Sequence, residues 1–78
     1  MVTSSSVSEA ELQATVERME RRWIGETKSP AVSVLVAAYP LLCARFEADL
    51  GASRRDVLLA RSAALMLIQA VAADDAAS

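Results

Sequence analysis

The stretch between residues 62 and 73 constrains the fold more than any other part of the chain, because only Ser62 and Gln69 in it are polar. Its length and its lack of turn residues predict a helix, which we expect to run from residue 53 to 73 with Ser53 as its N-cap. Apolar side chains fall on most of the circumference of such a helix. A helix of this kind needs to be buried on more than one side.

A second apolar stretch runs from Pro30 to Ala44. Ser29 is placed to cap a helix whose first position is Pro30, where the missing N–H of proline costs nothing. Three alternating valines favour a strand, but the chain has no other segment that could pair with it. We therefore expect a helix from 30 to 50 that is either kinked at Pro40 or split there into two helices, because a proline inside a helix removes a backbone hydrogen bond.

The beginning of the first helix has the clearest local signature in the chain. Ser8 and Glu11 have the spacing of a capping box, so we expect this helix to span residues 8–24. Four apolar residues then follow at spacings of four, three and four, which places them in one narrow seam along an amphipathic helix. These residues are Leu12, Val16, Met19 and Trp23.

The three predicted helices make a small all-α domain in a chain of 78 residues. We expect a disordered N-terminus over residues 1–7, a single helical domain over 8–73 and an acidic tail over 74–78. Each helix of a three-helix domain can bury about one stripe of its surface. The second and third helices are apolar on more than one side, so the surplus predicts a domain that is completed by oligomerisation.

Histidine and cysteine, the commonest zinc ligands, are nearly absent. The chain has no histidine and one cysteine, Cys43, which lies in an apolar stretch where a buried thiol is expected. Without histidine, catalytic triads and histidine-based acid–base chemistry are excluded, and the ligands for a zinc site are too few. We therefore expect a protein that is not an enzyme and that carries no cofactor or metal.

Charge and hydropathy give expectations about the surroundings of the protein. With a net charge of −2, the chain is not expected to have the broad basic surface that binds nucleic acid or anionic membranes. The first residues lack the basic and apolar regions of a secretory signal, and both apolar stretches are shorter than about 18 uncharged residues. We therefore expect a cytoplasmic protein without membrane contact. Seven arginines against one lysine, with 16 alanines, are typical of a high-GC bacterium or its phage.

The surplus of apolar surface also predicts the function. We expect a small regulator, adaptor or inhibitor that self-associates and binds another protein. The first-helix seam and two residues of the third helix are the candidate partner or oligomer interface. These candidates are Leu12, Val16, Met19, Trp23, Leu65 and Ile68.

Nucleic-acid binding is a second interpretation. Residues 46–61 resemble a helix-turn-helix core, with Leu-Gly at the turn and Ser53 capping the second helix. The resemblance implies a dimeric DNA-binding regulator in which Arg54, Arg55 and Arg61 face the major groove and the phosphates. The net negative charge makes this interpretation the less favoured one, because phosphate contacts supply most of the affinity for DNA.

A third interpretation concerns the end of the first predicted helix. Trp23, Ile24 and Gly25 resemble the W-x-G turn of the WXG100 secreted helical hairpins. The resemblance covers these three residues and implies a helical hairpin exported by a specialised secretion system. The tail signal of that family is a tyrosine followed, after three residues, by Asp or Glu. In this chain Tyr39 is followed at that spacing by Cys43.

Overall fold

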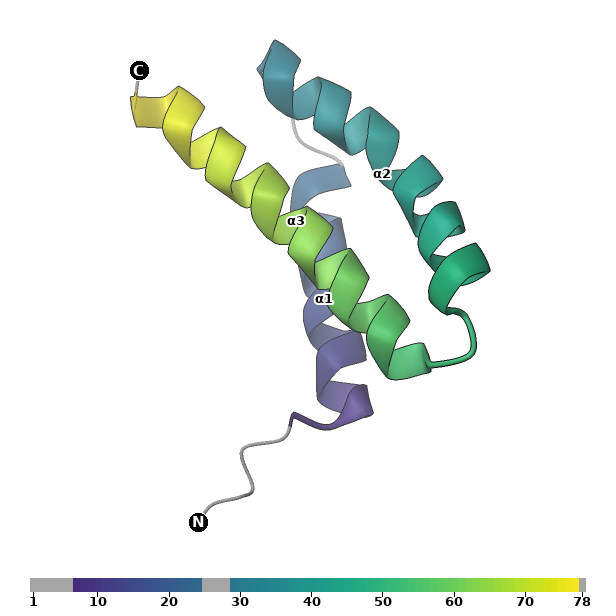
Figure 1. Cartoon of the computed structure of the whole chain (residues 1–78). Coiled ribbons are helices and arrows are strands. Elements are labelled where there is room, and N and C mark those ends of the chain that lie inside the picture. Colours follow the sequence, from purple (N-terminus) through teal and green to yellow (C-terminus); the bar gives the residue numbers. More distant parts are fainter. Residues whose placement is uncertain (1–6, 25–28, 78) are drawn as a thin grey trace.

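The computed structural model of the chain describes residues 7–24 and 29–77 (Figure 1). They form three α-helices: α1 (Glu9–Ile24), α2 (Pro30–Leu50) and α3 (Arg54–Ala77). No strand occurs in the described ranges, and the predicted all-α three-helix fold is confirmed. Most of the segment expected to be disordered, residues 1–6, lies outside the described residues.

Each helix begins at the serine that the sequence indicates. The Ser8 Oγ accepts a hydrogen bond from the Glu11 N–H at 3.1 Å, and the Ser8 N–H donates to Glu11 Oε1 at 3.0 Å, which completes the capping box. Backbone N–H groups in the first turns of α2 and α3 donate to the Oγ atoms of Ser29 and Ser53, each at 3.3 Å. These bonds satisfy donors that have no partner within their own helix.

The central helix is α3. It forms an antiparallel hairpin with α2, and α1 crosses it on another face, behind α3 in Figure 1. Because α1 and α2 each pack mainly against α3, the most apolar helix is covered on two sides, as its composition requires. Side chains from all three helices form the core: Val16, Trp23, Val32, Tyr39, Leu58, Leu65 and Ile68.

Pro40 lies inside α2 without dividing it into two helices. The proline side chain is exposed, and its nitrogen has no hydrogen to donate to the carbonyl of Val36 four residues earlier. Val32 before the proline and Cys43 after it both pack into the core. This packing on either side holds α2 against α3 across the position where one backbone hydrogen bond is missing.

The third helix is longer than the sequence indicates. It continues to Ala77, so Asp74 and Asp75 belong to the helix and not to an acidic tail. The Oγ of Ser29 donates a short hydrogen bond to the Asp75 carboxylate, which therefore lies beside the first turn of α2. A negative charge at this position is stabilised by the partial positive charge of a helix N-terminus. The contact closes the open end of the α2–α3 hairpin.

Gly51 ends α2 in an ordinary right-handed conformation, with φ of −59° and ψ of −18°. A glycine is required here by lack of space and not by an unusual φ. A Cβ atom at this position would collide with the backbone carbonyl oxygen of Glu47, one turn earlier in α2. This close approach lets the chain turn into α3 within three residues, with the Ser53 N–H bonded to the Leu50 carbonyl at 2.9 Å.

We expect Gly51→Ala to lower the free energy of unfolding by more than about 1 kcal/mol, since the Glu47 carbonyl cannot move aside without distorting the last turn of α2. The matched control is Ala52→Gly, which exchanges the same residue types at the exposed neighbouring position and should cost less than about 1 kcal/mol. Urea unfolding followed by circular dichroism measures both. A Gly51→Ala protein as stable as the wild type would contradict the steric explanation.

Candidate functional site

The six residues that the sequence assigns to an interface lie in the core of a single chain. Val16 and Leu65 are completely buried, Ile68 is 3% exposed and Trp23 is 7% exposed. The remaining two, Leu12 and Met19, are partly buried and pack against the same core. A side chain without exposed surface cannot contact a partner while the chain is folded. In the folded single chain these residues hold the chain's own helices together.

Large apolar side chains are exposed on α2 instead. Val34 is 68% exposed and Leu41 is 75% exposed, and the two are separated by two helical turns. Exposed alanines continue the same line at spacings of three and four residues, so the side chains share one face of the helix. This surface is termed the α2 stripe and consists of Val34, Ala37, Leu41, Ala44 and Ala48.

A second exposed apolar surface follows α3. Leu59 is 42% exposed, Met66 is 62% exposed and Leu67 is 55% exposed. Together with two exposed alanines they lie on the part of α3 that neither α1 nor α2 covers. This surface is termed the α3 stripe and consists of Leu59, Ala63, Met66, Leu67 and Ala70.

Both helices of the hairpin have the length and the apolar composition that crossing a membrane requires. The uncharged run in each helix is shorter than a span, but each helix contains an 18-residue segment with at most two charged residues that is apolar enough to cross a membrane. Two helices of this kind are weak evidence for insertion, since core helices of soluble proteins contain such segments as well. Core helices of soluble proteins are mostly buried, however. In this chain only 11% of the apolar 18-residue segment of α2 and 22% of that of α3 is buried. The chain itself thus leaves much of their apolar surface uncovered.

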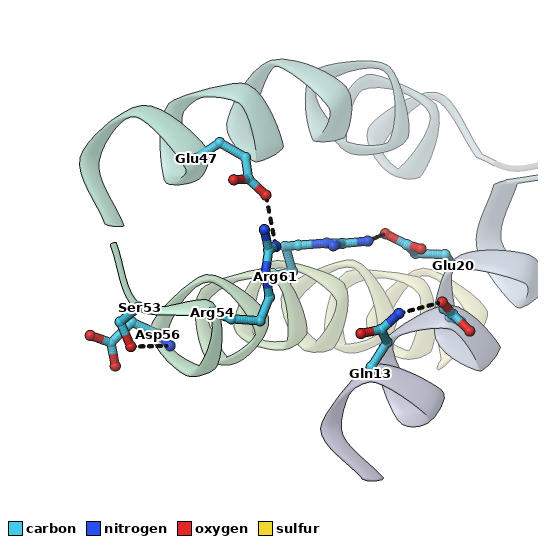
Figure 2. A network of polar contacts seen from close by, with 8 residues as sticks. Gln13, Glu20, Glu47, Ser53, Arg54, Asp56 and Arg61 are labelled. Carbon is cyan, nitrogen blue, oxygen red and sulfur yellow. Dashed lines mark hydrogen bonds and ion pairs between the residues drawn. The ribbon is translucent and has the colours of Figure 1, made fainter. Parts of the chain in front are cut away.

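One carboxylate connects the three helices. Arg61 of α3 donates from Nη2 to Glu20 Oε2 of α1 at 2.5 Å, and the Tyr39 hydroxyl of α2 donates to the same oxygen at 2.6 Å. The side chains of Arg61 and Glu20 are 22% and 23% exposed. Figure 2 shows Arg61 reaching from α3 to Glu20. These three residues are termed the polar junction.

The pKa values in the polar junction favour one protonation state. Burial raises the pKa of Tyr39 well above its ordinary value of 10.0, and the hydrogen bond to the Glu20 carboxylate raises it further. Burial lowers the pKa of Arg61, but hydrogen bonds to Glu20 and Tyr39 outweigh this effect, so the pKa is raised overall. The folded chain therefore keeps the Tyr39 phenol neutral and the Arg61 guanidinium charged. Arg61 and the Glu20 carboxylate form a structural ion pair.

The three arginines of the predicted DNA surface lie in different surroundings. Arg61 belongs to the polar junction. Arg54 donates from Nη1 to Glu47 Oε2 at 2.9 Å across the corner between α2 and α3 (Figure 2). Arg55 donates from Nη1 to the backbone oxygen of Val7 at 2.7 Å. Each guanidinium thus has a partner within the chain, and the three do not form one exposed basic surface.

Other candidate chemistry is sparse in the described parts of the chain. Cys43 is partly buried and packs against the core on α2. Within residues 7–24 and 29–77, no group of three His, Cys, Asp or Glu side chains is placed to hold a metal ion. A groove of about 550 Å³ lies between the end of α1 and the last turns of α3 and is lined by Arg22, Trp23, Gln69, Ala72, Ala73 and Ala76. The Arg22 guanidinium lies 5.3 Å from the centre of the Trp23 ring, a cation–π contact.

The polar junction predicts how stability changes in alkali. An unfolded tyrosine ionises near pH 10.0, whereas Tyr39 in the folded chain stays neutral to higher pH. The contribution of Tyr39 to the free energy of unfolding should therefore be constant below pH 10 and should decrease as the pH rises above it. Tyr39→Phe should remove this part of the pH dependence, which denaturant unfolding across a pH series measures.

A direct measurement is possible because Tyr39 is the single tyrosine in the chain. Its phenolate absorbance in the near ultraviolet should appear at a higher pH in the folded protein than in the protein in urea. The matched control is Glu20→Gln, which removes the negative charge beside the phenol and should move the midpoint back toward 10.0. A folded wild-type midpoint at the unfolded value would contradict the geometry of the junction.

The W-x-G resemblance implies a hairpin folded around residue 25, whereas the antiparallel hairpin of this chain consists of α2 and α3 and turns at residues 51–53. Gly25 itself lies outside the described residues. Comparisons with known protein families, with curated proteins and with solved structures found no match to the chain. The function therefore has to be inferred from the geometry of the chain itself.

Proposed function

We propose that the protein is a small non-enzymatic helical interaction module that self-associates and acts by binding a partner protein. The observation that carries this proposal is the exposure of large apolar side chains on α2 and α3, with Val34, Leu41 and Met66 each more than half exposed. Each Å² of apolar surface that binding removes from water contributes about 25 cal/mol of favourable free energy. Contiguous apolar surfaces of this kind on soluble proteins mark interaction sites.

The chemistry of the two stripes supports a regulator, an adaptor or an inhibitor. Neither stripe contains a nucleophile, an acid–base pair or a metal ligand. An apolar helix face without reactive groups acts by occupying a surface of its partner, as amphipathic helices do when they lie in an apolar groove. Such binding can bring two proteins together or block a site that another molecule needs.

A protein partner is supported over nucleic acid by the distribution of charge. The net charge is −2, and the guanidinium groups of Arg54 and Arg61 already bind carboxylates of the same chain. A DNA-binding surface gains its affinity from arginine and lysine side chains that reach phosphates. Freeing Arg61 for that role would break the half-buried ion pair with Glu20.

Self-association is tested by light scattering behind a sizing column, with the loaded concentration varied from about 1 to about 500 µM. We expect the mass to rise from 8.3 kDa to at least twice that value as apolar surface becomes buried between copies. The control is the double variant Leu41→Glu with Met66→Glu, which places a charge on each stripe at exposed positions and should remain monomeric. A wild-type protein that is helical by circular dichroism and monomeric throughout would contradict self-association.

A further inference from the structure

We infer that the α2 stripe is the surface through which two copies of the chain meet, with their α2 helices antiparallel and a two-fold axis beside Leu41. This inference rests on the proposed function and names the surface that it uses. The α2 stripe contains Leu41, whose exposure of 75% is the largest among the exposed large apolar side chains of the described residues. It therefore has the most exposed of these side chains at the centre of one helix face.

The charges of α2 leave this stripe free for an apolar contact. From Pro30 to Ala44 the helix has no charged residue, and the three charged residues that follow lie beside the stripe and not on it. Arg45 pairs with Asp49 at 2.9 Å, and Glu47 pairs with Arg54 at 2.9 Å. Packing a second helix on the stripe thus buries no charge that lacks a partner.

The stripe is complementary to itself when it is reversed. An antiparallel arrangement about Leu41 places Leu41 beside its own copy and Val34 opposite Ala48 of the second copy. Ala37 then lies at the level of Arg45 of the second copy, and Ala37 and Ala44 of the two copies are one residue out of level with each other. Larger side chains thus face small ones at the ends, and alanines on either side of the centre allow the helix axes to approach closely. A surface that fits its own reversed copy is what a two-fold interface requires.

The α3 stripe is less suited to pairing with its own copy. Asp56 and Asp74 lie on the same face of α3 at the two ends of that stripe. An antiparallel pair of α3 helices would place Asp56 of one copy near Asp74 of the other, and a parallel pair would place like residues together. Both directions bring carboxylates together, and like charges across an interface oppose association.

A membrane surface is a poorer occupant of the α2 stripe than a second copy. Helices that lie on membranes are rich in lysine and arginine on their polar face, whereas α2 has one arginine, Arg45, beside Glu47 and Asp49. Insertion across a bilayer would in addition pull Tyr39 away from Glu20 or carry the charged junction into the lipid. A second copy covers the stripe without disturbing either.

The size of the contact sets the expected strength. The stripe extends from residue 34 to 48, which is about 21 Å along the helix axis. One pair of crossing helices buries less than the roughly 800 Å² per partner of a standard interface, so we expect a reversible dimer that forms in the micromolar range.

The test uses a single cysteine as a reporter of the two-fold axis. In a Cys43→Ser background, Leu41→Cys places a thiol beside its own copy, and mild oxidation should give a covalent dimer rapidly, since a disulfide needs Cα atoms about 4.4–6.8 Å apart. The matched control is Met66→Cys in the same background, which is 62% exposed on the α3 stripe and should cross-link no faster than the same protein in urea. Non-reducing electrophoresis measures both rates, and circular dichroism verifies that each variant is folded.

A second measurement does not depend on cross-linking. Leu41→Glu should weaken the dimer at least tenfold in sedimentation equilibrium, whereas Met66→Glu should leave the dissociation constant within twofold of the wild type. A wild-type dimer that survives Leu41→Glu and cross-links through residue 66 overturns the assignment to α2 while self-association stands. A wild-type protein that is monomeric at all concentrations overturns both proposals. Binding of that monomer to phosphatidylcholine vesicles, lost in Leu41→Glu, identifies a lipid surface as the occupant instead.

Discussion

The arrangement of the three helices depends on one carboxylate. Glu20 accepts hydrogen bonds from Tyr39 of α2 and from Arg61 of α3, and no other contact described here joins all three helices through polar groups. Apolar packing is non-directional, so a core of Val, Leu and Ile side chains can tolerate sliding and rotation of its helices. Hydrogen bonds at 2.5 and 2.6 Å have defined directions, and they fix the rotation of α1 and α2 about their axes relative to α3. Which side of α2 faces outward follows from this fixed rotation.

The uncovered stripes are a consequence of α3 lying between two helices that pack mainly on it. α1 and α2 cover two sides of α3, and within residues 7–24 and 29–77 no further helix covers its third side or the outer side of α2. α2 and α3 are each apolar enough to be buried on every side. Three helices are too few to cover both of them completely. The fold is thus locally satisfied at its caps and its core while it leaves apolar surface that another molecule can cover.

The sequence predicted the helices well and the faces poorly, for a physical reason. Helix starts depend on local chemistry, and Ser8, Ser29 and Ser53 each make the predicted capping bond. The faces of α2 and α3 cannot be chosen from spacing, because a helix that is apolar all round has no distinct buried side. The seam of α1 was identified correctly as one apolar line, and within the folded chain it packs into the common core. The polar junction joins residues up to 41 positions apart, and no local pattern relates them.

Three consecutive residues of α2 have three different roles. Tyr39 is anchored in the polar junction, Pro40 removes a backbone hydrogen bond, and Leu41 is exposed on the outer face. A helix bends most readily where such a bond is missing, so the turn beneath Leu41 is the easiest part of α2 to deform. Because the Tyr39 hydroxyl is held by Glu20 beside this position, bending α2 here would strain the internal hydrogen bond, and that bond therefore opposes the bend. The interior anchor at Tyr39 and the exposed side chain of Leu41 thus share a single helical turn, and the internal bond keeps the outer face in place where the backbone is weakest.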